Sequence, residues 1–280
     1  MEDVTPQQAV AKYYSRLGSR LGYKLVMGRS QHFGYYDKTH TNEPAAQQKY
    51  HQEFAKLLTL KSGMKVLDAG CGQGVVACYL AQQHGVDVTG ITVVPHEVSS
   101  AEQRAKKLGV QDHTTFILAD YAKPPFKPAT FDRIYTTETL SHAVDVQAVV
   151  EVFMRLLKPG GKLICAEYEF DYDKFGEDGR WAAEFVKRHA AIHGVYQFGP
   201  GQFMSKLRAA GFTQVKELDW TRHVAPSYKR LARLAKPIAS IVRPLRLQRF
   251  FVNAAAADMY AKGAERDAFA YKVYVAAKKG

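Results

Sequence analysis

The stretch VLDAGCGQG, residues 66–74, places three glycines directly after an apolar run. Glycine turns between a strand and a helix often bind phosphate, but no Lys-Ser or Lys-Thr follows here to meet a phosphate and its magnesium. The dinucleotide-binding spacing is also absent, because Val75 stands where its third small residue would fall. The remaining pattern is G-x-G-x-G, with Asp68 two residues before the first glycine. Such a turn lets the backbone approach an uncharged amino-acid and ribose portion of a ligand.

A second candidate for chemistry is Glu138, the only acid between Asp132 and Asp145, with His142 four residues further on. A carboxylate or an imidazole can remove a proton from a substrate, and a carboxylate can also stabilise a developing cation. Both residues could instead have a structural role, since Glu138 could orient a loop or a cofactor group and an isolated histidine is more often structural. We expect Glu138 to be the catalytic base, with His142 as a second base or as its hydrogen-bond partner.

Aromatic residues gather in two stretches, SQHFGYYD at 30–37 and EYEFDY at 167–172. Aromatic faces stabilise a nearby cation, so a set of them beside the site favours an apolar acceptor. For any single ring a position in the core is the more frequent outcome, and the prediction depends on the set. The expected acceptor-binding residues are His32, Phe33, Tyr36, Tyr168 and Phe170, with Tyr35 and Tyr172 next to them.

These groups must be positioned by a series of apolar runs and helical patterns that begins at Lys65. The alternation is typical of an α/β fold, a parallel sheet with helices on its faces. Helices are predicted at 75–85, 95–109 and 146–157, ended by Gly or by KPGG. The last strand, AFAYKVYVAA, is expected to be antiparallel. Open sheets of this kind bind ligands at the carboxyl ends of their strands, where the glycine turn and Glu138 fall.

Two segments interrupt the series. Residues 1–60, with the aromatic-rich helix AVAKYYSRLGSRLGYKLV, are expected to form a helical cap. Residues 222–265 are expected to form a basic helical lid. The α/β core then spans 61–221 and is completed by a strand within 266–280.

The formal net charge of +12 is concentrated in the expected lid. No Asp or Glu occurs from Trp220 to Ala257, where YKRLARLAKPIASIVRPLRLQRFF interleaves basic and apolar residues as interfacial helices do. We expect Pro237 and Pro244 to break this segment into short helices. Its charge would meet an anionic headgroup, a diphosphate or a membrane surface, and a solvated face is the alternative.

Composition disfavours several other classes of protein. No apolar run is long enough to span a membrane, and MEDVTPQQAV lacks the apolar core of a signal peptide. Three cysteines, an odd number, predict reduced thiols in a cytoplasmic protein. No Cys or His spacing suggests a zinc site, and we assign no metal.

Several motifs in order resemble the class I S-adenosylmethionine-dependent methyltransferases, from roughly Leu60 to Trp220 and in the final strand. VLDAGCGQG resembles the family's cofactor loop, ADYAKPPF its third-strand turn, and FDRIYTTETLSHA with LLKPGGKL its fourth strand, following helix and turn. The resemblance implies a Rossmann-like fold with a seven-stranded, mostly parallel sheet and helical cap segments. It implies that S-adenosylmethionine contacts Asp68, Gly70, Cys71, Gly72, Gly74, Thr92, Asp120, Tyr121 and Thr137.

Asp120 would meet the adenine amino group, with Tyr121 beside it. The superfamily commonly ends its second strand in an acid that binds the ribose, whereas VTGITVV places Thr92 there. A similar Gly-x-Thr ending occurs in cyclopropane fatty acid synthases, mycolic acid methyltransferases and prenyl diphosphate C-methyltransferases.

Within the superfamily, residues 134–170 are most similar to the sterol side-chain methyltransferases, in Glu138, in His142-Ala143 and in Tyr168-Glu169-Phe170. The sterol signature Tyr-x-x-Gly-Trp-Gly is absent, so the acceptor implied is broader: an isoprenoid, sterol-like or other lipid-like alkene, methylated on carbon. N- or O-methylation of a small natural product stays open.

Two further hypotheses are disfavoured. Nucleic-acid methylation would need its Pro-Pro-aromatic motif after the fourth strand, where this chain has TTETLS. A non-catalytic cofactor-binding partner protein is disfavoured by the intact glycine turn together with the charged Glu138. The expected partner is a small apolar or amphipathic substrate, with an anionic headgroup as one option, and the expected location is the cytoplasm with peripheral contact to a membrane.

Overall fold

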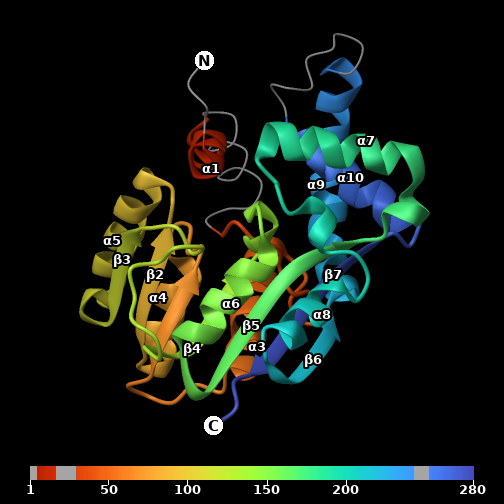
Figure 1. Cartoon of the computed structure of the whole chain (residues 1–280). Coiled ribbons are helices and arrows are strands. Elements are labelled where there is room, and N and C mark those ends of the chain that lie inside the picture. The colour runs from red at the N-terminus through yellow and green to blue at the C-terminus, as the bar shows by residue number, and fades with distance from the viewer. Residues whose placement is uncertain (1–4, 17–29, 243–251) are drawn as a thin grey trace.

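The computed structural model describes residues 5–16, 30–242 and 252–280 of the chain. Within them, a seven-stranded sheet has the order β3-β2-β1-β4-β5-β7-β6 and carries helices on its faces (Figure 1). Strands pair in parallel except at β7, which pairs antiparallel with β5 and β6. The predicted Rossmann-like, mostly parallel sheet is therefore confirmed. The strands are β1 (Lys65–Ala69), β2 (Asp87–Thr92), β3 (Thr114–Leu118), β4 (Phe131–Thr137), β5 (Leu157–Phe170), β6 (Thr213–Asp219) and β7 (Phe269–Ala277).

The core helices follow the predicted order and end where the sequence indicates. The predicted ends at Gly85 and Gly109 are confirmed, because each glycine lies in the left-handed region just after its helix. The KPGG segment, which was expected to end a helix, is also part of the next strand, because β5 begins at Leu157 and includes these four residues. The helices are α3 (Glu43–Leu58), α4 (Val75–His84), α5 (Pro95–Leu108), α6 (Val146–Leu156) and α8 (Gln202–Ala209), with short 3-10 turns η1 (Gln111–His113), η2 (Leu140–His142) and η3 (Val195–Gln197).

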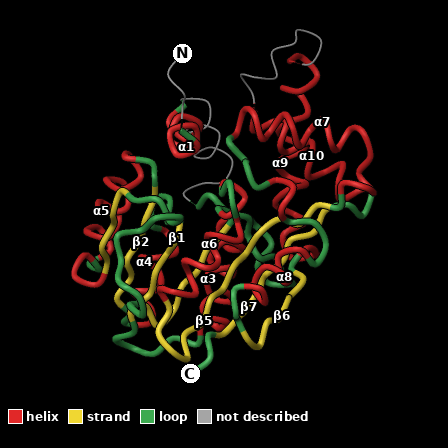
Figure 2. Tube along the Cα trace, viewed as in Figure 1, coloured by secondary structure: helices red, strands yellow, loops and turns green. Residues whose placement is uncertain are grey.

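Four further helices lie above the carboxyl ends of the strands and form a cap (Figures 1 and 2). α10 packs against both α9 and α7. α3, in contrast, packs against the sheet, with Tyr50, Phe54 and Leu58 fully buried. The cap helices are α1 (Pro6–Ser15), α7 (Tyr172–Ala190), α9 (Thr221–Val242) and α10 (Val252–Glu265).

The expectation that Pro237 ends a helix is wrong, because α9 continues through both Pro226 and Pro237. A proline removes one backbone hydrogen bond. The buried face of α9, which includes Val224 and Tyr228, holds the helix against its neighbours. Packing therefore outweighs the local signal. Pro244 and most of the predicted helix 9–26 lie outside the described residues.

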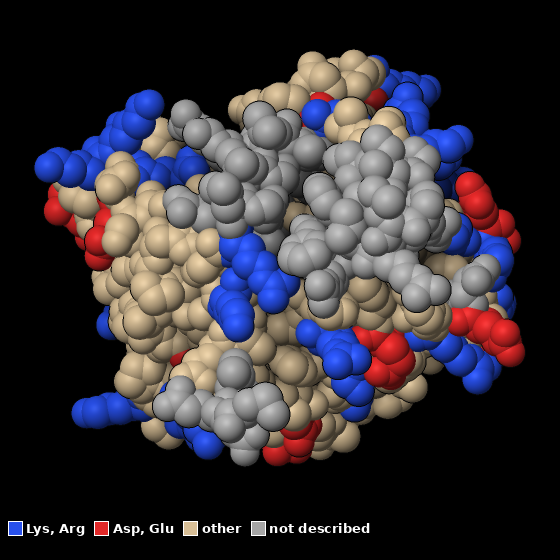
Figure 3. Space-filling view, turned by 90° about the horizontal axis from the view of Figure 1, so that it is seen from above, with Lys and Arg blue, Asp and Glu red and all other residues tan. Residues whose placement is uncertain are grey.

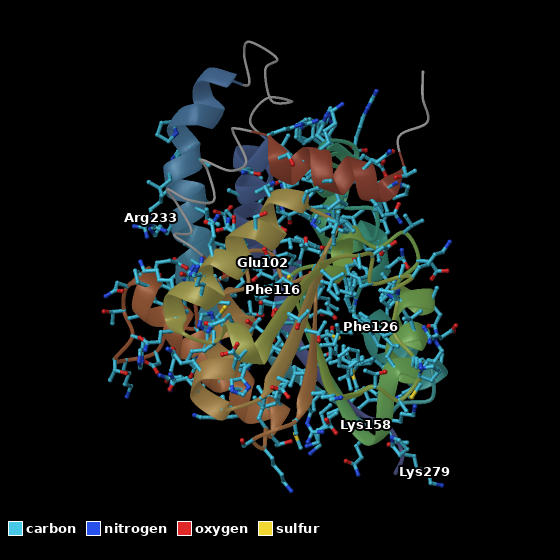
Figure 4. All side chains as sticks on the ribbon, turned by 90° about the vertical axis from the view of Figure 1, so that its left-hand side faces the viewer. Glu102, Phe116, Phe126, Lys158, Arg233 and Lys279 are labelled. Atoms are coloured by element: carbon cyan, nitrogen blue, oxygen red, sulfur yellow. The ribbon has the colours of Figure 1, made fainter. Side chains whose placement is uncertain are left out.

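The cap covers only one end of the sheet. Lys158 and Lys279 lie at the end opposite the cap, as Figure 4 shows. The cap end carries the helices described above and a cavity between them and the strands. No helix in the described part of the chain is both long and apolar enough to cross a membrane.

Candidate active site

One cavity of about 250 Å³ lies between the carboxyl ends of β1, β2 and β4 and the cap helix α1. This is the position at which open α/β sheets bind ligands. α1 lines it with Gln7, Val10 and Tyr14. Eight of the nine predicted cofactor residues line it as well: Asp68, Gly70, Cys71, Gly72, Thr92, Asp120, Tyr121 and Thr137.

The ninth, Gly74, does not line the cavity but precedes α4 in the left-handed region, with φ of 69°. A Cβ there would lie 2.8 Å from Ala101 and from Phe116. Gly70, in the turn itself, has φ of 94°, and its Cβ would come 2.3 Å from the hydroxyl of Thr139. The glycine turn is thus packed closely against α5, β3 and the loop after β4.

Two predicted acids in the cavity already have partners. The Tyr135 hydroxyl donates to Asp68 Oδ2 at 2.7 Å, and burial raises the pKa of Asp68 to about 7. Asp120 accepts from the side-chain amide of Gln7 at 2.7 Å and from the backbone amide of Ala122 at 2.8 Å. The bond from Gln7 connects Asp120 directly to α1.

A third acid, Glu97, was not singled out from the sequence. The Thr92 hydroxyl donates to Glu97 Oε2 at 2.8 Å and the Gln31 amide donates to Oε1 at 3.1 Å. Glu97 lines the cavity and is 3% exposed, and this burial raises its pKa. A carboxyl group from the first turn of α5 thus lies beside the end of β2, where the strand itself has Thr92. The available signal was an acid in the first turn after Pro95, where the helix dipole favours one.

The charges of the cavity fit S-adenosylmethionine. The described lining residues include five carboxyl groups and no Lys or Arg. These carboxyl groups attract a ligand that carries a sulfonium and an ammonium group, and they repel a pyrophosphate. The carboxyl groups belong to Asp68, Glu97, Asp120, Glu138 and Asp145.

Glu138 follows β4 directly, at the edge of the cavity. Its Oε1 accepts from the backbone amide of Phe33 and from the Tyr271 hydroxyl, both at 2.9 Å, and its Oε2 accepts from the Tyr168 hydroxyl. Burial raises the pKa of Glu138 to about 8, although the Phe33 and Tyr271 bonds act in the opposite direction. Three donors therefore fix a carboxyl group that is protonated more readily than an ordinary glutamate.

The predicted aromatic residues lie behind Glu138. Phe33, Tyr168 and Phe170 do not line the cavity. They belong to an aromatic cluster in which the centroids of Phe33 and Tyr168 lie 5.7 Å apart and those of Phe170 and Tyr260 lie 5.9 Å apart. Glu138 thus stands between the cavity and this cluster. The aromatic cluster consists of Phe33, Tyr168, Phe170, Tyr228, Tyr260, Phe269 and Tyr271.

The other two predicted acceptor residues are placed differently. His32 lines the cavity and is buried, which lowers its pKa to about 4. The Tyr36 hydroxyl donates to Glu43 Oε2 at 3.0 Å, away from the lining residues. Burial and Glu43 raise the pKa of Tyr36 to about 12.

His142 lines the cavity but its ring nitrogens are engaged. Nδ1 lies 2.9 Å from the carbonyl oxygen of Ala191, and Nε2 lies 2.9 Å from the Tyr14 hydroxyl. Since a carbonyl only accepts, Nδ1 carries the proton and Nε2 accepts from Tyr14. Burial lowers the pKa of His142 to about 4. The ring is therefore neutral, and it joins α1 to the loop after β4.

A fully buried acid, Glu167, was also missed by the sequence analysis. The amide of Ser141 donates to its Oε2 at 3.1 Å, and further amides of the same loop face it. Burial raises the pKa of Glu167 to about 8. Glu167 thus holds the loop that follows Glu138 and carries His142. Its signal was weak, because an acid next to Tyr168 in a strand reads as a solvent-facing residue.

Comparison with known proteins agrees with this geometry. A family model described as a methyltransferase domain matches residues 60–211. The chain is 29% identical to an S-adenosyl-L-methionine-dependent Diels-Alderase, iccD, of Talaromyces variabilis, over 88% of this chain and 87% of the relative. It is 28% identical to a 27-O-demethylrifamycin SV methyltransferase of Amycolatopsis mediterranei, over 83% of each chain.

A third relative is a 24-methylenesterol C-methyltransferase of Arabidopsis thaliana, 30% identical over 70% of this chain and 55% of the relative. Among solved structures, the [4+2]-cyclase SpnF superposes with a TM-score of 0.78, at 24% identity over 98% of this chain and 96% of that one. Because the matching family model covers more than half of the chain, and the acidic, glycine-lined cavity suits the family's cofactor, the chain belongs to the S-adenosylmethionine-dependent methyltransferases.

Proposed function

We propose that this methyltransferase methylates a carbon atom of an isoprenoid, sterol-like or other lipid-like alkene. The observation that supports this most is the position of Glu138, a buried carboxyl group between the cavity and the aromatic cluster. An amine or hydroxyl acceptor does not call for rings around its base. A carbocation does, because rings packed behind the carboxylate keep away the water that would otherwise capture the cation.

The chemistry assigns Glu138 a role after methyl transfer. The cofactor supplies an electrophilic methyl group on a sulfonium. The π electrons of the acceptor would form the new carbon–carbon bond while the methyl–sulfur bond breaks and leaves its electron pair on a neutral thioether, and the neighbouring carbon would become a cation. The Glu138 carboxylate stabilises this cation and then takes a proton from an adjacent carbon, whose C–H electrons restore the double bond. Phe33, Tyr168 and Tyr271 keep the carboxylate oriented for this step.

We further propose that the cavity residues hold the cofactor in the way the resemblance implies, with one addition. Glu97 would take the part of the missing strand-end acid, held by Thr92 and Gln31. Asp120 would share its carboxylate between the cofactor and Gln7 of α1. Gly74 would serve the turn and α4 without touching the ligand.

The second candidate is N- or O-methylation of a small natural product. The acidic lining favours it for one class of acceptor, since five carboxyl groups and no described Lys or Arg would also attract an amine. The relative that acts on demethylrifamycin is consistent with this second candidate. Product analysis separates the two, because the carbon-13 shift of a labelled methyl group identifies the atom to which it is bound.

The variant Glu138→Gln tests the first proposal. Glutamine keeps the shape and loses both the charge and the basicity. We expect near-normal cofactor affinity by calorimetry, with turnover reduced on the order of 100-fold or more. Glu169→Gln is the matched control, because Glu169 lies nearby on β5 and does not line the cavity. A loss of cofactor affinity in proportion to turnover would make Glu138 a binding residue and remove the proposal.

A further inference from the structure

The outer face of α9 carries a stripe of basic residues that the proposed reaction does not use. α9 has 22 residues and contains no Asp or Glu. Its exposed basic residues follow one another at intervals of seven, four and three, so they share one face of the helix. At 1.5 Å per residue the stripe is about 21 Å long. We name it the α9 stripe, formed by Arg222, Lys229, Arg233 and Lys236.

The α9 stripe has no role in the cavity or in the core. None of its four residues lines the cavity. The opposite face of α9, including Val224, Ser227 and Tyr228, is the buried one. Arg233, labelled in Figure 4, points away from the protein core. From above, Figure 3 shows Lys and Arg side chains along the upper right edge of the cap.

The helix that carries the stripe is firmly fixed to the core. Glu43, which is 7% exposed, accepts from the Ser227 hydroxyl at 2.8 Å and from the Tyr36 hydroxyl at 3.0 Å, and it lies 3.7 Å from Arg230. The Ser227 hydroxyl also accepts from the amide of Gly34. These bonds hold in place the helix that carries the stripe. Its members repel one another unless anions lie opposite them.

We propose that the α9 stripe binds the surface of an anionic phospholipid bilayer. A straight basic row matches a plane of phosphate headgroups, and each Lys or Arg near such a surface adds to binding. The stripe offers no aromatic side chain on which the bases of a single-stranded nucleic acid could stack. This proposal goes beyond the methylation reaction and does not depend on which atom is methylated.

The test uses the full chain and vesicle flotation. Vesicles contain phosphatidylcholine alone or with about one third phosphatidylglycerol. The variant Lys229→Gln/Arg233→Gln/Lys236→Gln removes three charges from the stripe. The control removes three exposed charges elsewhere: Lys61→Gln/Lys106→Gln/Lys107→Gln. Residues 243–251, which lie outside the described residues, are unchanged in both variants, and thermal unfolding checks that each variant folds.

We expect the wild type and the control to float with anionic vesicles and not with neutral ones. The stripe variant should bind on the order of 100-fold more weakly, at about a factor of five per charge. Equal flotation with both vesicle types, or equal losses in stripe variant and control, would overturn the proposal. So would tight binding of single-stranded RNA that the stripe variant loses while vesicles are ignored.

Discussion

The hydroxyl of Tyr271 gives the sharpest test of how Glu138 works. Tyr271→Phe removes one of three donors to the carboxylate and changes little else in volume. A hydrogen bond to a charged group contributes about 1.5–3 kcal/mol, and one pKa unit corresponds to about 1.4 kcal/mol. Since the bond favours the charged form, its loss should raise the pKa of Glu138 by about 1–2 units above its present value of about 8.

This shift has a direct kinetic consequence. A base works only when deprotonated, so wild-type turnover should rise with pH toward a plateau, with an apparent pKa near 8. In Tyr271→Phe the plateau should be nearly kept while the rise moves to higher pH. At neutral pH turnover should therefore fall about 10–100-fold. The assay is turnover against pH at saturating cofactor.

A matched control lies three residues further along β7. The Tyr274 hydroxyl donates to Glu169 at 3.3 Å and does not contact Glu138. Tyr274→Phe should leave the pH profile unchanged. An unmoved profile in Tyr271→Phe, or the same shift in both variants, would refute the assignment of Glu138 as the titrating base.

Two other buried acids give separate predictions. Glu97→Gln should weaken cofactor binding by about 10-fold or more, as calorimetry would detect, because a charged acceptor is lost, whereas Glu102→Gln on the exposed side of α5 should not. Glu167 has a folded-state pKa near 8, raised from about 4.5, so the folded chain binds more protons than the unfolded chain between these values. The free energy of unfolding should therefore fall by up to about 1.4 kcal/mol per pH unit as pH rises from about 5 to about 8. Glu167→Gln should flatten this dependence in urea titrations, and a slope equal to that of the wild type would contradict it.

The parts of the fold that the sequence predicts well are those with strong local signals. Alternating apolar runs predict the strands, and Gly85 and Gly109 mark the ends of two helices. The glycine turn and the strand ends place the cavity, because the carboxyl ends of parallel strands meet at one edge. Pro237 fails as a signal because the burial of α9 decides its course.

The missing parts of the site are contacts between distant segments. Nothing in the sequence distinguishes Glu97 and Glu167 from solvent-exposed acids, because the residue type does not indicate whether a carboxyl group is buried. Their importance depends on Thr92 and on the amide of Ser141, which the fold brings to them. Likewise, the sequence shows no hydrogen-bond partner for His142, but the hydroxyl of Tyr14 in α1, 128 residues away, donates to its Nε2.

The environment of Glu138 shows why register matters more here than any motif. Tyr168 and Tyr271 are direct partners in the antiparallel pairing of β5 and β7, so their side chains leave the sheet on the same face. Both hydroxyls then reach the one carboxylate that follows β4, the neighbour of β5 on its other side. A shift of β7 by one residue would turn Tyr271 to the opposite face and remove its donor without changing any residue of the site. Burial sets the raised pKa of Glu138, and the donor that strand pairing supplies from Tyr271 offsets part of that rise. The antiparallel final strand therefore contributes directly to the chemistry that we propose.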